Sequence, residues 1–247
     1  MDELTNGLGI WQIINSNIIT DIIAKSGFNI TLIDFEHGLH SPNTLQDIVF
    51  AAKSMKIKTI ARLPSVNFNN ISQIVDTGVD GILYPHIEEQ YQLDKVIQDT
   101  FLPPNGSRGY SPFVPKYNYG KIHNMNNKDP FLGILIESKK GLKNAESLVQ
   151  HPLIDFVYFG AYDLSVEMKK SGKIFDSEIF SELTKLSQIC KKYEKKIMAI
   201  YRNKEELMKL LKLNINYPIS SVDTSILLNA LSFQYELYSS LINSQFE

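Results

Sequence analysis

Carboxylates, imidazoles and a guanidinium follow short apolar runs at several points along this chain. The residues placed in this way are Asp34, Glu36, His37, Arg62, His86, Glu137, Asp163 and Asp223. Side chains of these types transfer protons, stabilise developing anions and hold metal ions. For any one of these residues, a structural role as a helix cap or in an ion pair explains its position about as well as a catalytic role does. If all of them met at one face, several buried charges would have to be paired at once, which weakens that explanation.

Two of these residues have the chemistry of metal ligands. Glu137 and Asp163 offer carboxylate oxygens, and the chain has one cysteine and no His-x-x-x-His spacing. Oxygen ligands of this kind suit a hard divalent ion such as Mg²⁺ or Mn²⁺. Such an ion usually keeps some of its waters, so a substrate could bind it through two oxygens.

The elements that must position these side chains are short and apolar. Eight runs rich in Ile, Val and Phe alternate with longer segments of helical period. The runs are Gly9–Ile14, Ile30–Phe35, Thr59–Leu63, Gly81–Tyr84, Leu132–Ile136, Phe156–Phe159, Ile197–Tyr201 and Pro218–Val222. The alternation predicts an α/β fold, a single (β/α)₈ TIM barrel over residues 1–247. A doubly wound open sheet is the alternative, but neither Gly-x-Gly-x-x-Gly nor a Walker A motif is found.

In a barrel the carboxyl ends of all strands open on one face, so the polar residues above are expected to meet there. No lysine ends a strand, which argues against Schiff-base chemistry. No glycine-rich turn follows the last two strands, which argues against a phosphorylated sugar substrate. Other polar candidates receive simpler interpretations: His40 as a loop residue, His123 and His151 as exposed, and Cys190 as packing.

Two segments extend beyond the regular alternation. Residues 101–130 form a long aromatic connection, which is either an active-site loop or a surface excursion. Residues 225–242 carry leucines and tyrosines at helical spacing. This C-terminal helix either completes the outer ring of the barrel or exchanges onto a neighbouring copy.

Composition narrows the class of protein further. The 247 residues carry 25 Lys and Arg against 27 Asp and Glu, for a net charge of −2. This balance gives no electrostatic footprint for nucleic acid or an anionic membrane. The sequence has no signal-peptide pattern and no long apolar stretch, so we expect a cytoplasmic protein that binds neither nucleic acid nor membrane.

Seven motifs in order resemble one family of enzymes. They are Leu32-Ile-Asp-Phe-Glu-His-Gly38, Ala61-Arg-Leu-Pro64, Asp76-Thr-Gly78 with Tyr84-Pro85, Pro103-Pro-Asn-Gly-Ser-Arg-Gly109, Ile136-Glu137, Phe159-Gly-Ala-Tyr-Asp-Leu-Ser165 and Ser221-Val-Asp-Thr224. Together they resemble the HpcH/HpaI aldolase family, the metal-dependent (class II) pyruvate aldolases of the 4-hydroxy-2-oxoheptanedioate and 2-keto-3-deoxy-sugar-acid type.

The resemblance implies a reaction and a role for each matching residue. A 4-hydroxy-2-oxo acid would be cleaved reversibly to pyruvate and an aldehyde, with Mg²⁺, Mn²⁺ or Co²⁺ on Glu137 and Asp163. His37 would be the general base, oriented by Asp76, and Arg62 would lie near the keto oxygen. Trp11, Tyr110 and Tyr162 are expected to bind substrate. This chain departs from the family in having Leu135, Tyr162 and Tyr110. The resemblance therefore does not predict which aldehyde this protein uses.

Two other functions and one assembly remain open at this point. A lyase for acyl-CoA esters shares the metal carboxylates and would use the basic residues Arg108, Lys116, Lys121 and Lys128 of the long loop. A barrel with decayed catalysis would keep only a binding role. The resemblance further implies a homo-oligomer, often a hexamer or trimer of dimers, with an exchanged terminal helix.

Overall fold

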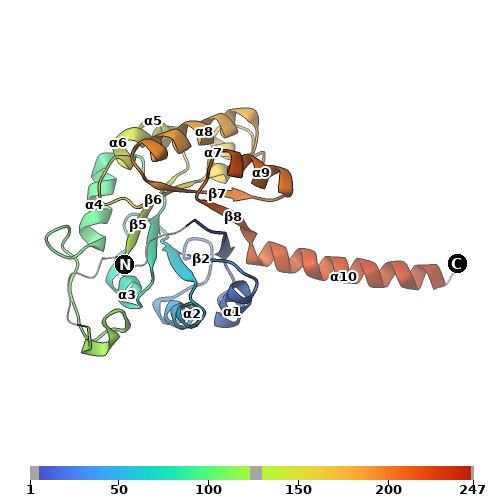
Figure 1. Ribbon diagram of the computed structural model, residues 1–247, viewed down its shortest axis with the longest axis horizontal. Coiled ribbons are helices and arrows are strands. Elements are labelled where there is room, and N and C mark those ends of the chain that lie inside the picture. The colour runs from blue at the N-terminus through green and yellow to red at the C-terminus, as the bar shows by residue number, and fades with distance from the viewer. Residues whose placement is uncertain (1–5, 123–129, 246–247) are drawn as a thin grey trace.

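A closed barrel of eight parallel strands, paired in sequence order, forms the centre of the protein in its computed structural model (Figure 1). The structure describes residues 6–122 and 130–245. The strands are β1 Gly9–Gln12, β2 Ile30–Asp34, β3 Lys58–Arg62, β4 Gly81–Tyr84, β5 Phe131–Ile136, β6 Phe156–Phe159, β7 Lys196–Tyr201 and β8 Tyr217–Val222. The ring is closed by β1 pairing with β8, so the predicted (β/α)₈ barrel is confirmed.

The strands are apolar on both faces because one face fills the barrel and the other packs against helices. Every residue of β2, from Ile30 to Asp34, is buried. Packing inside is close: a Cβ added to Gly133 would lie 2.1 Å from the Phe156 ring on the neighbouring strand. A continuous buried core therefore holds the strand ends in fixed positions.

Helices follow the strands, and all but the last of them lie around the barrel (Figure 1). They are α1 Asn17–Lys25, α2 Pro42–Ser54, α3 Ile71–Asp76, α4 Gln90–Thr100, α5 Lys139–Lys143, α6 Ala145–Val149, α7 Ala161–Glu167, α8 Ser177–Lys192, α9 Lys204–Lys212 and α10 Asp223–Gln245, with a 3₁₀ turn η1 at Pro115–Gly120. Local chemistry sets their starts: Ser41 and Thr44 form a capping box before α2, with Pro42 at its first position. Among the described helices, none is long and apolar enough to cross a membrane.

The long connection after α4 lies at the amino ends of the strands. Each helix runs back from the carboxyl end of one strand to the amino end of the next, so a segment between α4 and β5 must lie there. Its contacts agree: Arg108 pairs with Asp76 at the end of α3 at 3.2 Å. The backbone of Lys116 approaches Gly78, just before β4. The described part of the expected active-site loop therefore lies opposite the mouth of its own barrel. Lys128 and His123 lie outside the described residues.

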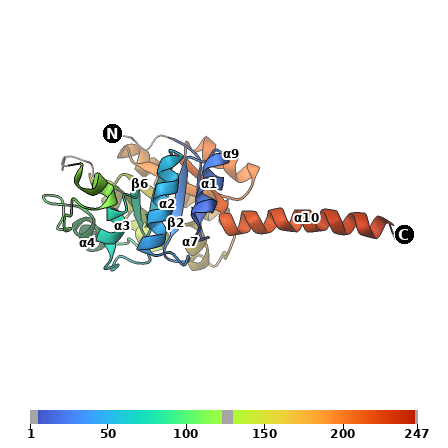
Figure 2. The ribbon, with the colours of Figure 1, turned by 90° about the horizontal axis from the view of Figure 1, so that it is seen from below.

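The last helix does not join the outer ring. In both ribbon views α10 extends away from the barrel, and it covers the predicted helix 225–242 (Figures 1 and 2). Its large apolar side chains are exposed, among them Leu228, Leu231 and Tyr238. The place of an eighth outer helix, between α9 and α1, is bordered by exposed apolar residues as well, including Ile18 and Leu211. The C-terminal helix therefore does not complete the outer ring of its own barrel, which is one of the two roles expected for it.

Candidate active site

A pocket of about 310 Å³ opens where the strands end. Its lining comes from seven of the eight strands or the segments that follow them: Trp11, Ile13, Asp34, His37, Arg62, Leu135, Glu137, Tyr158, Gly160, Ala161, Tyr162, Asp163, Ile200 and Val222. The sequence candidates His37, Arg62, Glu137, Asp163, Trp11 and Tyr162 are all present. The carboxyl end of the barrel thus brings together a histidine, an arginine and three acidic residues.

Arg62, at the end of β3, is held on three sides. Its Nε and Nη2 donate to the two carboxylate oxygens of Asp34 at 3.0 and 2.6 Å. Nη1 lies 3.0 Å from Oε2 of Glu36, and the guanidinium carbon stands 4.6 Å from the centre of the Trp11 ring. A guanidinium has five N–H donors, so two remain for a substrate oxygen. Arg62 is therefore a fixed cation in the lining of the pocket.

The Asp34–Arg62 pair shifts both pKa values. Burial would raise the pKa of Asp34, but the hydrogen bond and charge of Arg62, with the backbone N–H groups of His37 and Glu36, bring it below the usual value. Burial would lower the pKa of Arg62, and Asp34 and Glu36 raise it. Both groups are charged at neutral pH, which keeps a positive charge at the pocket.

Glu137, directly after β5, is only 5% exposed and lies beside Asp163 at the start of α7. Burial above all raises its pKa, Asp163 and Glu36 raise it further, and the backbone N–H of His86 opposes them, for a pKa of about 8. Glu137 is buried and Asp163 is exposed, but their charges are close enough to repel each other. A divalent cation between the two carboxylates would remove that repulsion.

The donor set therefore fits a hard divalent ion with two protein oxygens and several waters. Within residues 6–122 and 130–245, no group of three or more metal-ligating side chains gathers. Gly160 lies against Glu137 on the other side: an added Cβ there would be 2.3 Å from Cβ and 3.2 Å from Oε2 of Glu137. Only glycine leaves room for the carboxylate where it is.

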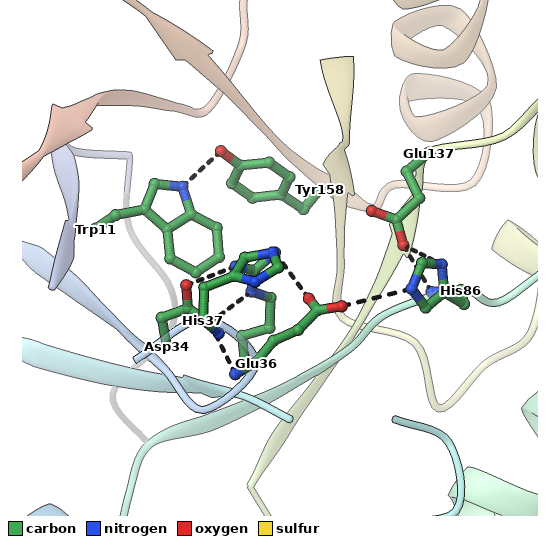
Figure 3. Close-up of polar contacts among 8 residues, drawn as sticks. Trp11, Asp34, Glu36, His37, His86, Glu137 and Tyr158 are labelled. Carbon is green, nitrogen blue, oxygen red and sulfur yellow. Dashed lines mark hydrogen bonds and ion pairs between the residues drawn. The ribbon is translucent and has the colours of Figure 1, made fainter. Parts of the chain in front are cut away.

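His86 contacts Glu137 twice, a role that its position after β4 alone did not reveal. Its backbone N–H and its Nδ1 each lie 2.9 Å from Oε1 of Glu137. Its Nε2 lies 3.4 Å from Oε1 of Glu36 (Figure 3). The backbone of His86 is left-handed, with φ of 55°, which is uncommon for a residue other than glycine.

His37 lines the pocket with an exposed side chain, and its backbone N–H donates to Asp34 at 3.2 Å. An accessible imidazole beside a cation and two carboxylates can accept a proton from a bound hydroxyl group. Asp76, its expected partner, ends α3 and pairs with Arg108. The structure does not bring His37 and Asp76 together in one chain, because α3 returns to the opposite end of the barrel.

Of the three aromatic candidates, Trp11 and Tyr162 line the pocket and Tyr110 does not. The indole N–H of Trp11 donates to the Tyr158 hydroxyl at 2.7 Å across the pocket, and Tyr162 stands at the mouth, 46% exposed. Tyr110 is not part of the pocket lining. Its ring packs edge-on against Tyr117, 5.1 Å between centres, in the long connection at the amino ends of the strands.

The remaining candidates have structural roles. Asp223 accepts the backbone N–H groups of Ile13 and Ile14 at 3.0 and 2.9 Å, which ties the end of β1 to the start of α10. His40 follows β2 and packs beside the Phe35 ring. Cys190 is buried on α8, as expected from its spacing, and burial raises the pKa of its thiol to about 12.

The geometry bears on both alternative functions. Arg108, the first basic residue of the long connection, has a fully buried side chain paired with Asp76, so it does not offer a phosphate site at this mouth. The side chains that the sequence predicts to be catalytic, Arg62, His37, Glu137 and Asp163, line one pocket. The carboxyl end of this (β/α)₈ barrel therefore holds a pocket with a guanidinium fixed in place by Asp34 and Glu36.

Residues 8–230 match the profile of the HpcH/HpaI aldolase/citrate lyase family. Because the match spans nearly the whole barrel, the chain belongs to that family, and the resemblance seen in the motifs is confirmed. Named relatives of this family are aldolases, which supports a role in breaking or forming carbon–carbon bonds.

Two curated relatives show the degree of similarity. Hydroxypyruvate/pyruvate aldolase of Roseobacter denitrificans is 28% identical over 181 residues, 72% of this chain and 71% of its own length. The 2-keto-3-deoxy-L-rhamnonate aldolase of Klebsiella pneumoniae is 30% identical over 168 residues, 65% of this chain and 62% of its own.

Solved structures agree on the fold. Citrate synthase SbnG superposes with a TM-score of 0.86 at 22% identity, over 97% of this chain and 96% of its own. An HpcH/HpaI aldolase/citrate lyase family protein from Burkholderia cenocepacia superposes with a TM-score of 0.88 at 18% identity, over 96% of both chains.

Proposed function

We propose that this protein is a divalent-metal-dependent aldolase that cleaves a 4-hydroxy-2-oxo acid to pyruvate and an aldehyde, and catalyses the reverse addition. The observation that carries the proposal is the pairing of Glu137 and Asp163 in one pocket with Arg62 and His37. The named aldolases among the relatives support the same class of reaction.

The cleavage needs one proton acceptor and a place for negative charge. His37 takes the proton of the 4-hydroxyl group, the C3–C4 bond breaks, and its electron pair forms the C2–C3 double bond of the pyruvate enolate as the aldehyde leaves. Protonation of C3 then gives pyruvate. The two free N–H groups of Arg62 are available to the oxygen on which negative charge develops.

Glu137 and Asp163 would hold the cation, which supplies Lewis-acid stabilisation of the charge on the 2-oxo oxygen. Mg²⁺ and Mn²⁺ suit this oxygen donor set, and Co²⁺ is a third candidate. Fixed in place by Asp34 and Glu36, Arg62 needs little rearrangement when the charge forms.

The aldehyde half of the substrate would face Tyr162 and the apolar wall of the pocket. Trp11 and Tyr158 close one side through their hydrogen bond, and Ile200 and Val222 add aliphatic surface. Tyr162 at the mouth narrows the entrance and offers one hydroxyl group. We therefore place the specificity for the aldehyde largely with Tyr162.

We also propose a homo-oligomer, with a hexamer or trimer of dimers as the expected form. Exposed apolar side chains lie both on α10 and beside the uncovered place between α9 and α1, so α10 of one copy would cover the barrel of another. Asp76 could orient His37, and Tyr110 could reach substrate, only across such an interface. Sedimentation of the full chain tests the assembly.

The proposed reaction is tested by assaying pyruvate release from a panel of 4-hydroxy-2-oxo acids with Mg²⁺, Mn²⁺ and Co²⁺, and after chelation. We expect turnover with at least one of these ions and none after complete removal of metal. Turnover that survives chelation would overturn the metal-dependent mechanism. Turnover of acyl-CoA esters in place of the oxo acids would favour the acyl-CoA lyase.

A further inference from the structure

The clearest arrangement not yet given a role is the contact of His86 with two acidic residues. His86 lies outside the pocket lining, yet its ring stands between Glu137 on the metal side and Glu36 on the arginine side (Figure 3). Glu36 contacts Arg62 through its other oxygen at 3.0 Å. A continuous row of contacts thus joins Asp34, Arg62, Glu36, His86 and Glu137.

We propose that His86 is a positioning residue that holds the Glu137 carboxylate in the orientation required to bind the metal. This inference rests on the proposed function, because it assumes that Glu137 is a metal ligand. His86 itself does not touch substrate or reacting atoms.

The two contacts of His86 indicate that it orients the Glu137 carboxylate, because both of them reach the same carboxylate oxygen. The backbone N–H and Nδ1 of His86 each lie 2.9 Å from Oε1 of Glu137, which occupies that oxygen with two partners. Both contacts of His86 are to Oε1, so the other oxygen, Oε2, is the one proposed to bind the cation. A carboxylate held by two partners loses the freedom to rotate about its last bond, and second-shell contacts of this kind raise metal affinity.

The backbone of His86 explains how one residue makes both contacts. His86 has a left-handed backbone with φ of 55°, and in this conformation its N–H and its Nδ1 both lie near the same oxygen of Glu137. Such a conformation costs energy in a residue with a side chain, and it persists when surrounding contacts fix it. Here Glu137 and Glu36 provide those contacts on the two sides of the ring.

Glu36 gives the arrangement its second anchor. Its Oε1 lies 3.4 Å from Nε2 of His86, and its Oε2 is fixed by Arg62. Arg62 therefore fixes Glu36, and Glu36 in turn holds the His86 ring that contacts Glu137. The two halves of the proposed site are coupled through His86.

The test measures Mn²⁺ binding to the full-length protein by electron paramagnetic resonance of free Mn²⁺, with no substrate present. His86→Gly tolerates the left-handed backbone but removes the ring, and His86→Asn tolerates it while retaining a polar amide near the place of Nδ1. His151→Asn is the matched control, since His151 lies in a loop before β6. Glu137→Gln shows how much binding belongs to this site.

We expect the Kd for Mn²⁺ to rise about 10- to 100-fold in His86→Gly. We expect it to return to within about threefold of the wild type in His86→Asn, with a wild-type Kd in His151→Asn. Thermal unfolding midpoints within about 2 °C of one another would show that the fold is intact.

Wild-type affinity in His86→Gly would overturn the positioning role and leave the proposed function standing. Equal loss in His86→Gly and His86→Asn would also overturn it, because the amide would then have failed to replace the ring. If wild-type protein and Glu137→Gln bind Mn²⁺ equally, Glu137 is not a ligand, and both the metal site and the role of His86 are wrong.

Discussion

Asp34 binds Arg62 through both of its carboxylate oxygens, at 3.0 Å to Nε and 2.6 Å to Nη2. The two residues end adjacent strands that pair in register, β2 and β3, so the barrel itself brings them opposite each other. Both side chains are largely buried, and a buried pair of this kind is costly to break on one side only. The pair therefore links the stability of the barrel to the charge in the pocket.

Replacing Arg62 with methionine should destabilise the protein by about 3–5 kcal/mol, because Asp34 is left as a buried charge without its partner. Urea unfolding followed by circular dichroism measures this change. The double variant Arg62→Met with Asp34→Asn should recover part of the loss. Equal stability of the single and double variants would mean that the pair is not coupled.

Stability should also depend on pH through Asp34. Its pKa is lowered in the folded protein, so the unfolded chain takes up a proton first as the pH falls. The stabilisation is full above the unfolded value of about 4 and is lost as the pH falls through the lower folded value. Unfolding free energies between pH 7 and pH 3 should therefore fall more in the wild type than in Asp34→Asn. Parallel curves would contradict this.

Gly160→Ala should weaken metal binding while leaving the barrel folded. The new methyl group would lie 2.3 Å from Cβ of Glu137, so the side chain or its backbone must move. Isothermal titration with Mn²⁺ measures the effect, and we expect at least a tenfold rise in Kd. Gly109→Ala is the control because its added Cβ meets nothing within 4 Å. An unchanged Kd in Gly160→Ala would show that Glu137 does not need this close approach.

His37→Ala should reduce kcat by about 100- to 10,000-fold, the usual contribution of a general base. Because the side chain is exposed, we expect no loss of stability, and the affinity for metal and pyruvate should be unchanged. Steady-state kinetics and equilibrium binding together separate these effects. A normal rate in the variant would show that another group accepts the proton.

Tyr162→Ala should change the choice of aldehyde rather than the chemistry. Removing a ring that stands at the mouth, 46% exposed, enlarges the entrance. The KM for bulky aldehydes should then fall relative to that for small ones, with kcat for a small aldehyde nearly constant. Aldol addition of pyruvate to a series of aldehydes of increasing size measures this. A uniform change for all aldehydes would place specificity elsewhere.

The strands and most of the pocket could be predicted from the sequence because buried parallel strands are short apolar runs with sharp ends. The predicted run Gly81–Tyr84 coincides with β4, and Phe156–Phe159 coincides with β6. Since the carboxyl ends of such strands meet, Arg62 and Glu137 could be placed in one site without knowledge of their distance.

The composition of the long connection does not predict where it lies, but its position between a helix and the next strand does. A segment between a helix and the next strand lies at the amino end, which separates Tyr110 from the pocket of its own barrel. Asp76, at the end of α3, lies there for the same reason. The double contact of His86 depends on a backbone angle, and neither apolar periodicity nor spacing indicates one.

Trp11 is the single tryptophan of the chain, and it bonds to Tyr158, 147 residues away, under the guanidinium of Arg62. These contacts exist only when the first and sixth strands have taken their places in the closed ring. The tryptophan fluorescence of the protein therefore comes from one residue, and its change reports ring closure. A stopped-flow refolding trace would record the completion of the pocket without any added label.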